Sequence, residues 1–299
     1  MNMTDFSKRK KIIFISACVF VVCLIITAVL CLYIFVGGNS DSATQQPLSV
    51  HYIDVGQGDS VLIDCDDNYI LIDAGKAKAG DIVVNYLKNL GVDKLSLVIA
   101  THCDSDHIGG MTDVINNFKI DKFLMPSSVE KDINDSFYSD MVSALKRNNV
   151  NCESAALNAV MNFGGGTLMI LAPINLEATD DNDLSVVTKL SYGNSSFLFM
   201  GDASAQEESD LIDCSATIES DIIKIGHHGS KSSSSWDFIR RAAPKAAVIS
   251  CGLNNDYAHP SSTVLNTLKS IDCKYYRTDE QGTIVIGTDG TNYFFDTEK

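Results

Sequence analysis

The sequence predicts an α+β fold in which two sheets pack face to face with helices on their outer sides, behind one membrane-spanning helix. Three observations predict it. Residues 12–36 form an uncharged apolar run, and each half of the chain after residue 47 mixes short β-rich runs with amphipathic segments. Several apolar runs also end directly in His or Asp. Each sheet must bury its apolar face, so two mixed halves are expected to form layers.

Residues 12–36 are the expected transmembrane anchor. About 20 apolar residues suffice to cross the hydrocarbon core of a bilayer, and this run is longer. A signal peptide is the alternative, but its apolar region is usually only about 7–15 residues long. The basic cluster within residues 1–11 places the N-terminus in the cytoplasm. We therefore expect a single-pass protein of the cell membrane, with residues 37–47 as a polar tether and the remainder outside the cytoplasm.

Residues 48–299 are expected to form one acidic domain. Of the 23 Lys and Arg and 38 Asp and Glu in the chain, the first 47 residues hold four and two. The domain therefore has 19 against 36 and a net charge of −17. A basic footprint is typical of nucleic-acid binders, and this domain has none globally. Cations held in an acidic site would change the field locally.

The elements of this domain follow from apolar period and from Gly, Pro and Asp punctuation. We expect strands at 49–56, 60–65, 68–75, 95–101, 121–126, 166–173, 184–193, 195–202, 221–226, 246–252, 274–278, 282–288 and 292–296. We expect helices at 81–92, 108–118, 139–149, 204–212, 235–243 and 262–271.

The stretch THCDSDHIGG, residues 101–110, carries the densest chemistry. An extended segment places alternate side chains on one face, so His102, Asp104 and Asp106 can converge, and His107 can join them as the helix begins. Two imidazoles and two carboxylates suit Zn²⁺, Mn²⁺ or Fe²⁺ better than Ca²⁺. The alternative is a solvated Asp-rich loop, which the position after an apolar strand disfavours. Cys103 is expected to be a buried thiol rather than a ligand.

Further His and Asp residues also follow apolar strands. Asp202 ends FLFMGD and could bridge two cations, His227 and His228 occur in IGHHGS, and His259 occurs in YAHP. A Gly-Asp pair alone is no signal, because other such pairs exist at residues 58–59 and 80–81. The position of Asp202 between two His motifs is what makes it a candidate. By contrast, the sixth histidine, at residue 51, lies in a plain strand and is expected to be a core or edge residue.

The order of these motifs resembles the metallo-β-lactamase superfamily. HYIDVGQGDSVLI, THCDSDHIGG, GDAS, IGHHGSKSSSS and YAHP follow one another, and the chain is similar over residues 48–299 to the hydrolase domain of ComEC-like DNA-uptake competence proteins. The resemblance implies a four-layer αββα sandwich with a metal site at one edge of the two sheets. It also implies two divalent ions, Zn²⁺ or Mn²⁺.

The resemblance also implies a ligand set. His102 and Asp104 would hold the first metal, Asp106, His107 and His227 the second, and Asp202 would bridge them. Asp104 stands where many members have a second His, which makes the site harder and Mn²⁺ more plausible. Most members add another His before the Gly-Asp motif, and residues 180–190 contain none. The first metal is therefore expected to be weakly held, with Asn182, Asp183 or water as the replacement and His228 as the alternative to His227.

This constellation predicts hydrolysis by a metal-activated water. Asp106 is expected to orient that water or hold its proton. His259 is the candidate for leaving-group protonation or oxyanion contact, and its alternative is a loop histidine packed on Pro260. We expect His228, Ser230 and Lys231 to contact substrate, with a solvated Ser-rich loop as the alternative for the last two.

The resemblance favours a membrane-anchored phosphodiesterase or nuclease, with single-stranded DNA as one candidate substrate. The single expected span and the acidic domain argue against a processive nuclease. A metallo-hydrolase of a cell-envelope ester, a phosphocholine group or a lactam is the second hypothesis. The third, from another class, is a non-catalytic membrane-tethered binding module with a residual metal site.

Overall fold

The computed structural model describes residues 48–127 and 136–299. The expected cytoplasmic segment, anchor and tether, residues 1–11, 12–36 and 37–47, lie outside the described residues. Within the part that the structure describes, no helix is both long enough and apolar enough to span a membrane.

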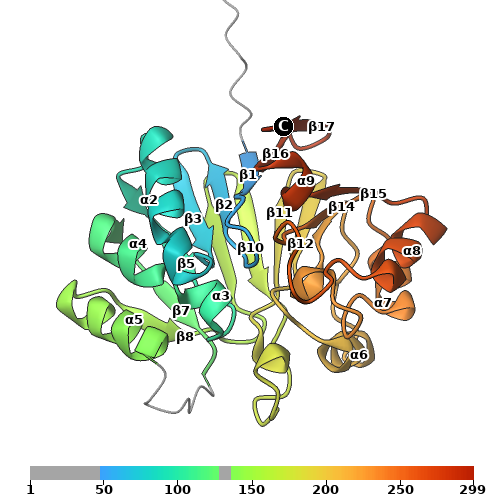
Figure 1. Ribbon diagram of the computed structural model, residues 1–299, viewed down its shortest axis with the longest axis horizontal. Helices are drawn as coiled ribbons and strands as arrows, with labels where there is room; N and C mark the ends of the chain where they lie inside the picture. Colours follow the sequence, from blue (N-terminus) through green and yellow to red (C-terminus); the bar gives the residue numbers. More distant parts are fainter. Residues whose placement is uncertain (1–47, 128–135) are drawn as a thin grey trace, which may run out of the picture. The chain divides into compact units, whose positions relative to one another are not determined.

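The first half of the domain and the C-terminal hairpin form one eight-stranded sheet (Figure 1). Its strand order is β17-β16-β1-β2-β3-β5-β7-β8. Strands β1 to β3 pair antiparallel, and β3, β5, β7 and β8 pair parallel. As a result β1, β3 and β5 all end at the same edge of the sheet. The bounds are β1 (Leu48–Tyr52), β2 (Val61–Cys65), β3 (Asn68–Ile72), β5 (Leu97–Ile99), β7 (Phe123–Met125), β8 (Cys152–Ser154), β16 (Ile284–Thr288) and β17 (Tyr293–Thr297).

The second sheet has seven strands, in the order β15-β14-β13-β12-β11-β10-β9. Strands β12 to β15 pair parallel, so β12, β13 and β14 also end at one edge. A separate two-stranded sheet joins β4 (Lys94–Leu95) to β6 (Lys119–Ile120). The bounds in the larger sheet are β9 (Val160–Phe163), β10 (Gly166–Ile170), β11 (Thr188–Tyr192), β12 (Ser195–Phe199), β13 (Ile222–Lys224), β14 (Ala246–Ile249) and β15 (Lys274–Arg277).

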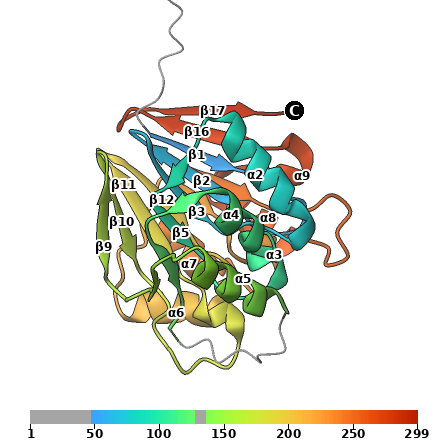
Figure 2. The ribbon, with the colours of Figure 1, turned by 90° about the vertical axis from the view of Figure 1, so that its left-hand side faces the viewer.

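Helices cover the outer face of each sheet (Figures 1 and 2). The first sheet carries α2 (Gly80–Asn89), α4 (Met111–Asn117) and α5 (Ser136–Arg147), and the second carries α6 (Ala205–Asp213), α7 (Trp236–Ala242) and α8 (Ser262–Ser270). Serine side chains start all three helices of the second set, because Ser204, Ser235 and Ser261 each accept a hydrogen bond from a backbone N–H of the first turn. The short helices are η1 (Ala77–Ala79), α3 (Ser105–Ile108), η2 (Asp181–Leu184), η3 (Gly226–Gly229) and α9 (Thr278–Gln281).

The apolar core has three layers that follow the strand period of two. Ile63 and Phe197 face each other's sheet in the central layer, whereas Leu62 packs under the helices of the first sheet and Leu198 under those of the second. Full burial of such a side chain contributes about 1.5–3 kcal/mol. The expected four-layer sandwich is therefore the observed architecture.

Two local expectations were wrong. The helix expected at 108–118 is two helices, α3 and α4, separated by Gly109 and Gly110. Both glycines have right-handed helical dihedrals, but a Cβ on Gly109 would collide with the backbone N of Ala77, and one on Gly110 with the carbonyl O of Ala74. The glycines therefore permit close packing rather than a left-handed turn. Strands β8 and β9 were also not expected, because they are short and largely exposed.

Candidate metal centre

The polar residues of the site follow strands of both sheets at one edge of the sandwich. His102 comes after β5 and Asp202 after β12, and the two neighbouring histidines lie in η3 after β13. The ends of parallel strands are where open α/β sheets usually bind ligands. In this sandwich the two such edges meet, so the chemistry is built between the sheets.

The motif at 101–110 is extended as far as Asp104 and helical from Ser105. Asp104 has φ −72° and ψ 147°, and α3 begins at the next residue. The helix therefore starts before Asp106 rather than after it. His107 therefore lies in the first helical turn, and its ring centroid is 4.1 Å from that of His102. Cys103 alternates to the other side and is buried in the apolar layer under the helices.

A first group of ligand atoms comes from His102, His107 and Asp202, which lie within 4.8 Å of one another. The Nε2 atom of His107 is 3.3 Å from Oδ1 of Asp202. All three residues are at most 3% exposed. Asp104 lies at the open side of this group, with Oδ2 3.7 Å from Nε2 of His102 and a half-exposed side chain.

A second group comes from Asp106, His107 and His228. The Nε2 atom of His228 lies 3.6 Å from Oδ2 of Asp106 and 3.4 Å from Oδ2 of Asp202. Because Asp202 and His107 face both groups, the donors form one continuous cluster. Asp202 therefore lies beside the ligand atoms of both groups, and its role as a bridge between two cations stays a prediction.

The two neighbouring histidines of η3 occupy different environments. His228 is 2% exposed, and its Nδ1 lies 3.0 Å from the carbonyl O of Ser250, which turns Nε2 toward the cluster. The His227 side chain is 26% exposed, its Nε2 is 3.9 Å from Asp202, and it belongs to no metal-binding group of the described residues. The geometry therefore favours His228 as the ligand, the alternative that the sequence left open.

Buried ligand atoms in the cluster lack hydrogen bonds. Within the described residues none is formed by Nε2 of His102, His107 or His228, or by Oδ1 of Asp202, although the last lies 3.3 Å from His107. A buried polar atom without a partner costs about 1–3 kcal/mol, so native proteins rarely leave several together. A divalent cation would satisfy these atoms, and the mixed nitrogen and oxygen donors suit Zn²⁺, Mn²⁺ or Fe²⁺. The residues present therefore fit the metals that the resemblance implies.

The electrostatics of the cluster also call for positive charge. Burial disfavours a charged imidazole, but the carboxylates of Asp202 and Asp59 outweigh it and raise the pKa of His228 to about 9. Likewise burial is outweighed at His107, whose pKa is raised well above its usual range by Asp202 and Asp73. In His102, burial and the neighbouring His107 lower the pKa. The carboxylates thus raise the pKa of two imidazoles at the place where a cation would balance the negative charge.

Asp73, which follows β3, holds the far side of His107 and was not among the expected site residues. Its Oδ2 accepts hydrogen bonds from Nδ1 of His107 at 2.7 Å and from Oγ1 of Thr101 at 2.6 Å, and its Oδ1 accepts from the Thr101 backbone N–H at 2.8 Å. A carboxylate behind a ligating histidine fixes the tautomer and orientation of the ring. Asp73 sits alone in LIDAG, so no local motif marks it.

A buried ion pair between Asp59 and Lys224 was also missed. The Nζ atom of Lys224 lies 2.5 Å from Oδ2 of Asp59, and Oδ1 of Asp59 lies 3.2 Å from Nδ1 of His228. Both partners are at most 3% exposed. The Gly58–Asp59 pair was set aside as uninformative, yet Gly58 has φ +148° and a Cβ there would collide with the carbonyl O of Asp106. The sequence sign of this ion pair was Lys224, a charged residue within the otherwise apolar strand DIIKIG.

The remaining expected residues are His259, Ser230 and Lys231. The His259 ring centroid lies 5.7 Å from that of His227, and burial together with the two η3 histidines lowers the pKa of His259 to about 4. A neutral imidazole favours oxyanion contact over leaving-group protonation. Ser230 hydrogen-bonds Ser232, and Lys231 is exposed.

Residues 180–190, which lack the additional histidine, form hydrogen bonds with the segment around Asp202. Asp183 accepts a hydrogen bond from Oγ of Ser204 at 2.5 Å and joins no metal-binding group of the described residues. Ser185 is buried, and its Oγ accepts from the backbone N–H of Asp202 at 3.1 Å. Asp183 is thus engaged by Ser204, and its role as a replacement ligand stays a prediction.

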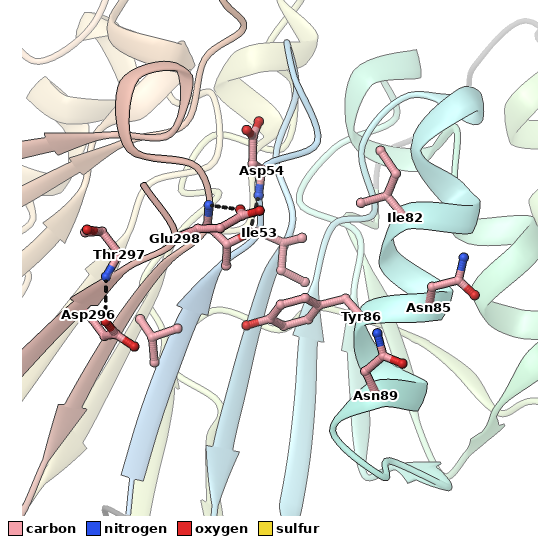
Figure 3. Close-up of a pocket in the computed structure, with 11 residues that line it drawn as sticks. Ile53, Asp54, Ile82, Asn85, Tyr86, Asn89, Asp296, Thr297 and Glu298 are labelled. Atoms are coloured by element: carbon pink, nitrogen blue, oxygen red, sulfur yellow. Dashed lines mark hydrogen bonds between the residues drawn. The ribbon is translucent and has the colours of Figure 1, made fainter.

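A separate pocket of about 600 Å³ lies between α2 and the β16–β17 hairpin (Figure 3). Tyr86 and Ile82 reach it from α2, and Asp54, Asp296 and Glu298 supply carboxylates. None of its lining residues belongs to the metal-binding groups. His51, expected as a core or edge histidine, is buried nearby with Nδ1 2.8 Å from the Tyr86 hydroxyl.

Curated relatives of this chain include competence proteins. ComE operon protein 3 of Bacillus subtilis is 29% identical over 79% of this chain and 32% of its own length. Competence protein ComA of Neisseria gonorrhoeae is 29% identical over 87% of this chain and 35% of its own length. Recombination protein 2 of Haemophilus influenzae is 28% identical over 83% of this chain and 29% of its own length. The chain therefore spans about a third of the length of the relatives it matches.

Solved structures share the fold at low sequence identity. The metallo-β-lactamase fold protein YhfI of Bacillus subtilis matches with a TM-score of 0.54 and 11% identity, over 83% of this chain and 100% of that one. CmlA, a diiron β-hydroxylase of Streptomyces venezuelae, matches with a TM-score of 0.55 and 12% identity, over 81% of this chain and 54% of CmlA. A family model described as the metallo-beta-lactamase superfamily covers residues 53–253. The expected resemblance is thereby confirmed, and the chain belongs to the metallo-β-lactamase superfamily.

Proposed function

We propose that this protein is a membrane-anchored, metal-dependent phosphodiesterase or nuclease. The observation that carries the proposal is the convergence of four buried ligand atoms without hydrogen bonds, from His102, His107, His228 and Asp202. Such a cluster at one edge of the sandwich is arranged to hold cations. Similarity to a competence protein supports a DNA-related phosphodiester as substrate.

The proposed ligands differ from the expected set in one residue. His102, Asp104 and Asp202 serve a first divalent ion, and Asp106, His107, Asp202 and His228 serve a second. The half-exposed Asp104 and the absent histidine at 180–190 make the first position the weaker one. Zn²⁺ and Mn²⁺ both suit these donors. His227 moves to the mouth of the site, where substrate would pass.

The chemistry follows from this arrangement. When bound, the divalent ions would supply an activated water at neutral pH and polarise the phosphate. Asp106 would orient the attacking water as a charged carboxylate. Burial alone would raise its pKa, but the neighbouring His228 and His107 hold that pKa well below its usual range. His259 faces the mouth and would donate a hydrogen bond to the substrate's oxygen. The exposed Lys231 would meet a phosphate charge, with Ser230 beside it.

The cellular setting is part of the proposal. The uncharged run at 12–36 would anchor the chain, with residues 1–11 in the cytoplasm and residues 48–299 outside. There the domain would meet exposed or short phosphodiesters. The net charge of this domain is −17, which argues against a long basic surface that binds nucleic acid. Bound cations would instead attract the anionic substrate locally.

The test is a panel of activities with the full chain in detergent. We expect the protein to retain one to two divalent ions after dialysis and, with Mn²⁺ or Zn²⁺, to cleave labelled single-stranded DNA or a simple phosphodiester. His107→Ala should remove the second ion and abolish cleavage. If the protein leaves DNA intact but releases choline or opens a lactam, this proposal is wrong. The protein would then be a metallo-hydrolase of an ester, phosphocholine or lactam substrate. Inactivity throughout, with a stable protein partner, would favour the binding module.

A further inference from the structure

The loop after β14, residues 252–261, carries an exposed aromatic ring beside the candidate metal centre. Tyr257 is 62% exposed, and its ring lies nearly parallel to that of His259, with centroids 5.6 Å apart and an interplanar angle of 26°. The His259 ring in turn lies 6.3 Å from that of His228. A row of rings therefore leads from a proposed metal ligand to an open aromatic face.

The loop is braced in this shape by Asn255. Its Oδ1 accepts the backbone N–H groups of Tyr257 and His259, at 3.1 and 3.0 Å, and its Nδ2 donates to the carbonyls of Gly252 and His259, at 2.9 and 2.6 Å. The backbone N–H of Gly252 donates to Oε1 of Gln57 at 3.1 Å, which ties the loop to the segment before Asp59. The backbone of Tyr257 is therefore fixed and its ring stacks on that of His259 before any substrate arrives, which lowers the entropy lost on binding.

The charge of the loop decides what this ring can recognise. Residues 252–261 contain Asp256 and no Lys or Arg. The loop therefore offers no lysine or arginine to a phosphate backbone, and the exposed face of the Tyr257 ring is suited to a flat, uncharged group of the substrate. Every nucleobase has a flat π face, and stacking on an aromatic side chain is the usual way in which proteins hold unpaired bases.

We propose that Tyr257 is a stacking platform for one unpaired nucleobase adjacent to the phosphodiester that is cleaved. The inference rests on the proposed function and adds to it a specificity-determining residue, one that selects unpaired over paired bases. A paired base is already stacked on its neighbours and would have to leave the helix to reach the ring. The protein would therefore prefer single strands to duplexes without reading their sequence.

The test uses the full chain loaded with Mn²⁺ and two single-stranded oligonucleotides, one with all its bases and one with abasic residues around the cleavage point. We expect Tyr257→Ala to raise KM for the base-bearing strand by about 5- to 100-fold. It should leave kcat and the KM for the abasic strand near their wild-type values. Tyr257→Phe should restore the wild-type KM because it keeps the ring. Leu253→Ala, which removes a 71% exposed side chain from the same loop, is the matched control and should change nothing.

Binding measured by fluorescence anisotropy at two salt concentrations separates this inference from the proposed function. The ratio of affinities for the two strands should fall toward one in Tyr257→Ala by the same factor at both salt concentrations, because stacking releases no counterions. This reading holds even for a protein that cleaves neither strand. Equal losses on both strands, no effect of Tyr257→Ala, or failure of Tyr257→Phe to restore binding would overturn the platform. So would a selective loss of phosphocholine binding, which would assign the ring to a cation.

Discussion

The Nδ1 atom of His107 donates a hydrogen bond to Oδ2 of Asp73 over 2.7 Å, and this contact aims the opposite ring nitrogen at Asp202. Both residues are fully buried. Because a carboxylate accepts only from a protonated nitrogen, the bond keeps Nε2 free of a proton when the ring is neutral. The candidate metal ligands are thus oriented by a second set of residues, and only the ligands themselves are concentrated in sequence motifs.

Replacement of Asp73 by Asn should weaken metal binding without removing a ligand. The amide can present its NH₂ group to His107 and then favours the wrong tautomer. Loss of such an outer partner typically lowers metal affinity about 10- to 100-fold. Competition against a chromogenic chelator measures this change, and Asp93→Asn, at an exposed position, is the control. Unchanged affinity in Asp73→Asn would show that Thr101 and packing alone orient the ring.

Substitution of the two histidines of η3 should have different effects, one on metal content and the other on KM. His228→Ala removes a buried donor that faces Asp106 and Asp202, so we expect the protein to lose one equivalent of metal. His227→Ala removes a ring from the mouth and should keep the metal while raising KM. Elemental analysis after dialysis gives the stoichiometry directly. The reverse pattern would restore His227 to the ligand role that the sequence motif suggested.

Breaking the buried ion pair of Asp59 and Lys224 should lower the free energy of unfolding. Burial alone would raise the pKa of Asp59, but Lys224 and His228 lower it, so the carboxylate is charged in the folded protein. Lys224→Met would leave that charge unpaired, and removing one partner of a buried ion pair typically costs about 3–5 kcal/mol. Urea denaturation of the metal-free protein measures the loss.

A double variant tests whether the pairing is the cause. Asp59→Asn in the Lys224→Met background removes the unpaired charge and should recover part of the stability. If the double variant were as unstable as the sum of the two single variants, the two residues would be acting independently.

The sequence was sufficient for the sandwich because period and punctuation are local properties. FLF in β12 alternates between two apolar layers, and Ser204 marks the start of α6 without any tertiary information. The same holds for His102 and His107, which share one motif. Asp59 and Asp73 could not be found in this way. Each is a single carboxylate in a strand-end loop, and what distinguishes it is the residue it meets from 28 to 169 positions away.

The choice between His227 and His228 was beyond the sequence for a different reason. Both have left-handed dihedrals, with φ of 48° and 53°, so neither the helical nor the strand period predicts where their side chains point. The carbonyl of Ser250 and the carboxylate of Asp59 lie at Nδ1 of His228, so that its Nε2 faces Asp106 and Asp202. Such a turn is defined by its surroundings rather than by its own residues.

Glu207 in α6 should make stability fall as pH rises. Its Oε1 accepts the backbone N–H of Ile174 at 2.9 Å, whereas Oε2 is buried and forms no hydrogen bond within the described residues. Burial raises the pKa of this carboxyl from 4.5 to about 7. Between these two values the folded protein keeps a proton that the unfolded chain has released. The free energy of unfolding therefore decreases across this window as pH rises.

Glu207→Gln removes this dependence, because the amide stays neutral and keeps an acceptor for Ile174. At pH 5 the variant and the wild type should differ little, and at pH 8 the variant should be more stable by on the order of 1–3 kcal/mol. Glu208, whose pKa burial also raises to about 7, is present in both proteins and cancels in the comparison. Urea unfolding at pH 5, 6, 7 and 8 gives the two curves, with Glu177→Gln at an exposed position as control. Parallel curves would mean that Glu207 ionises in the folded protein as readily as in the unfolded chain, and that the buried Oε2 has a solvent partner.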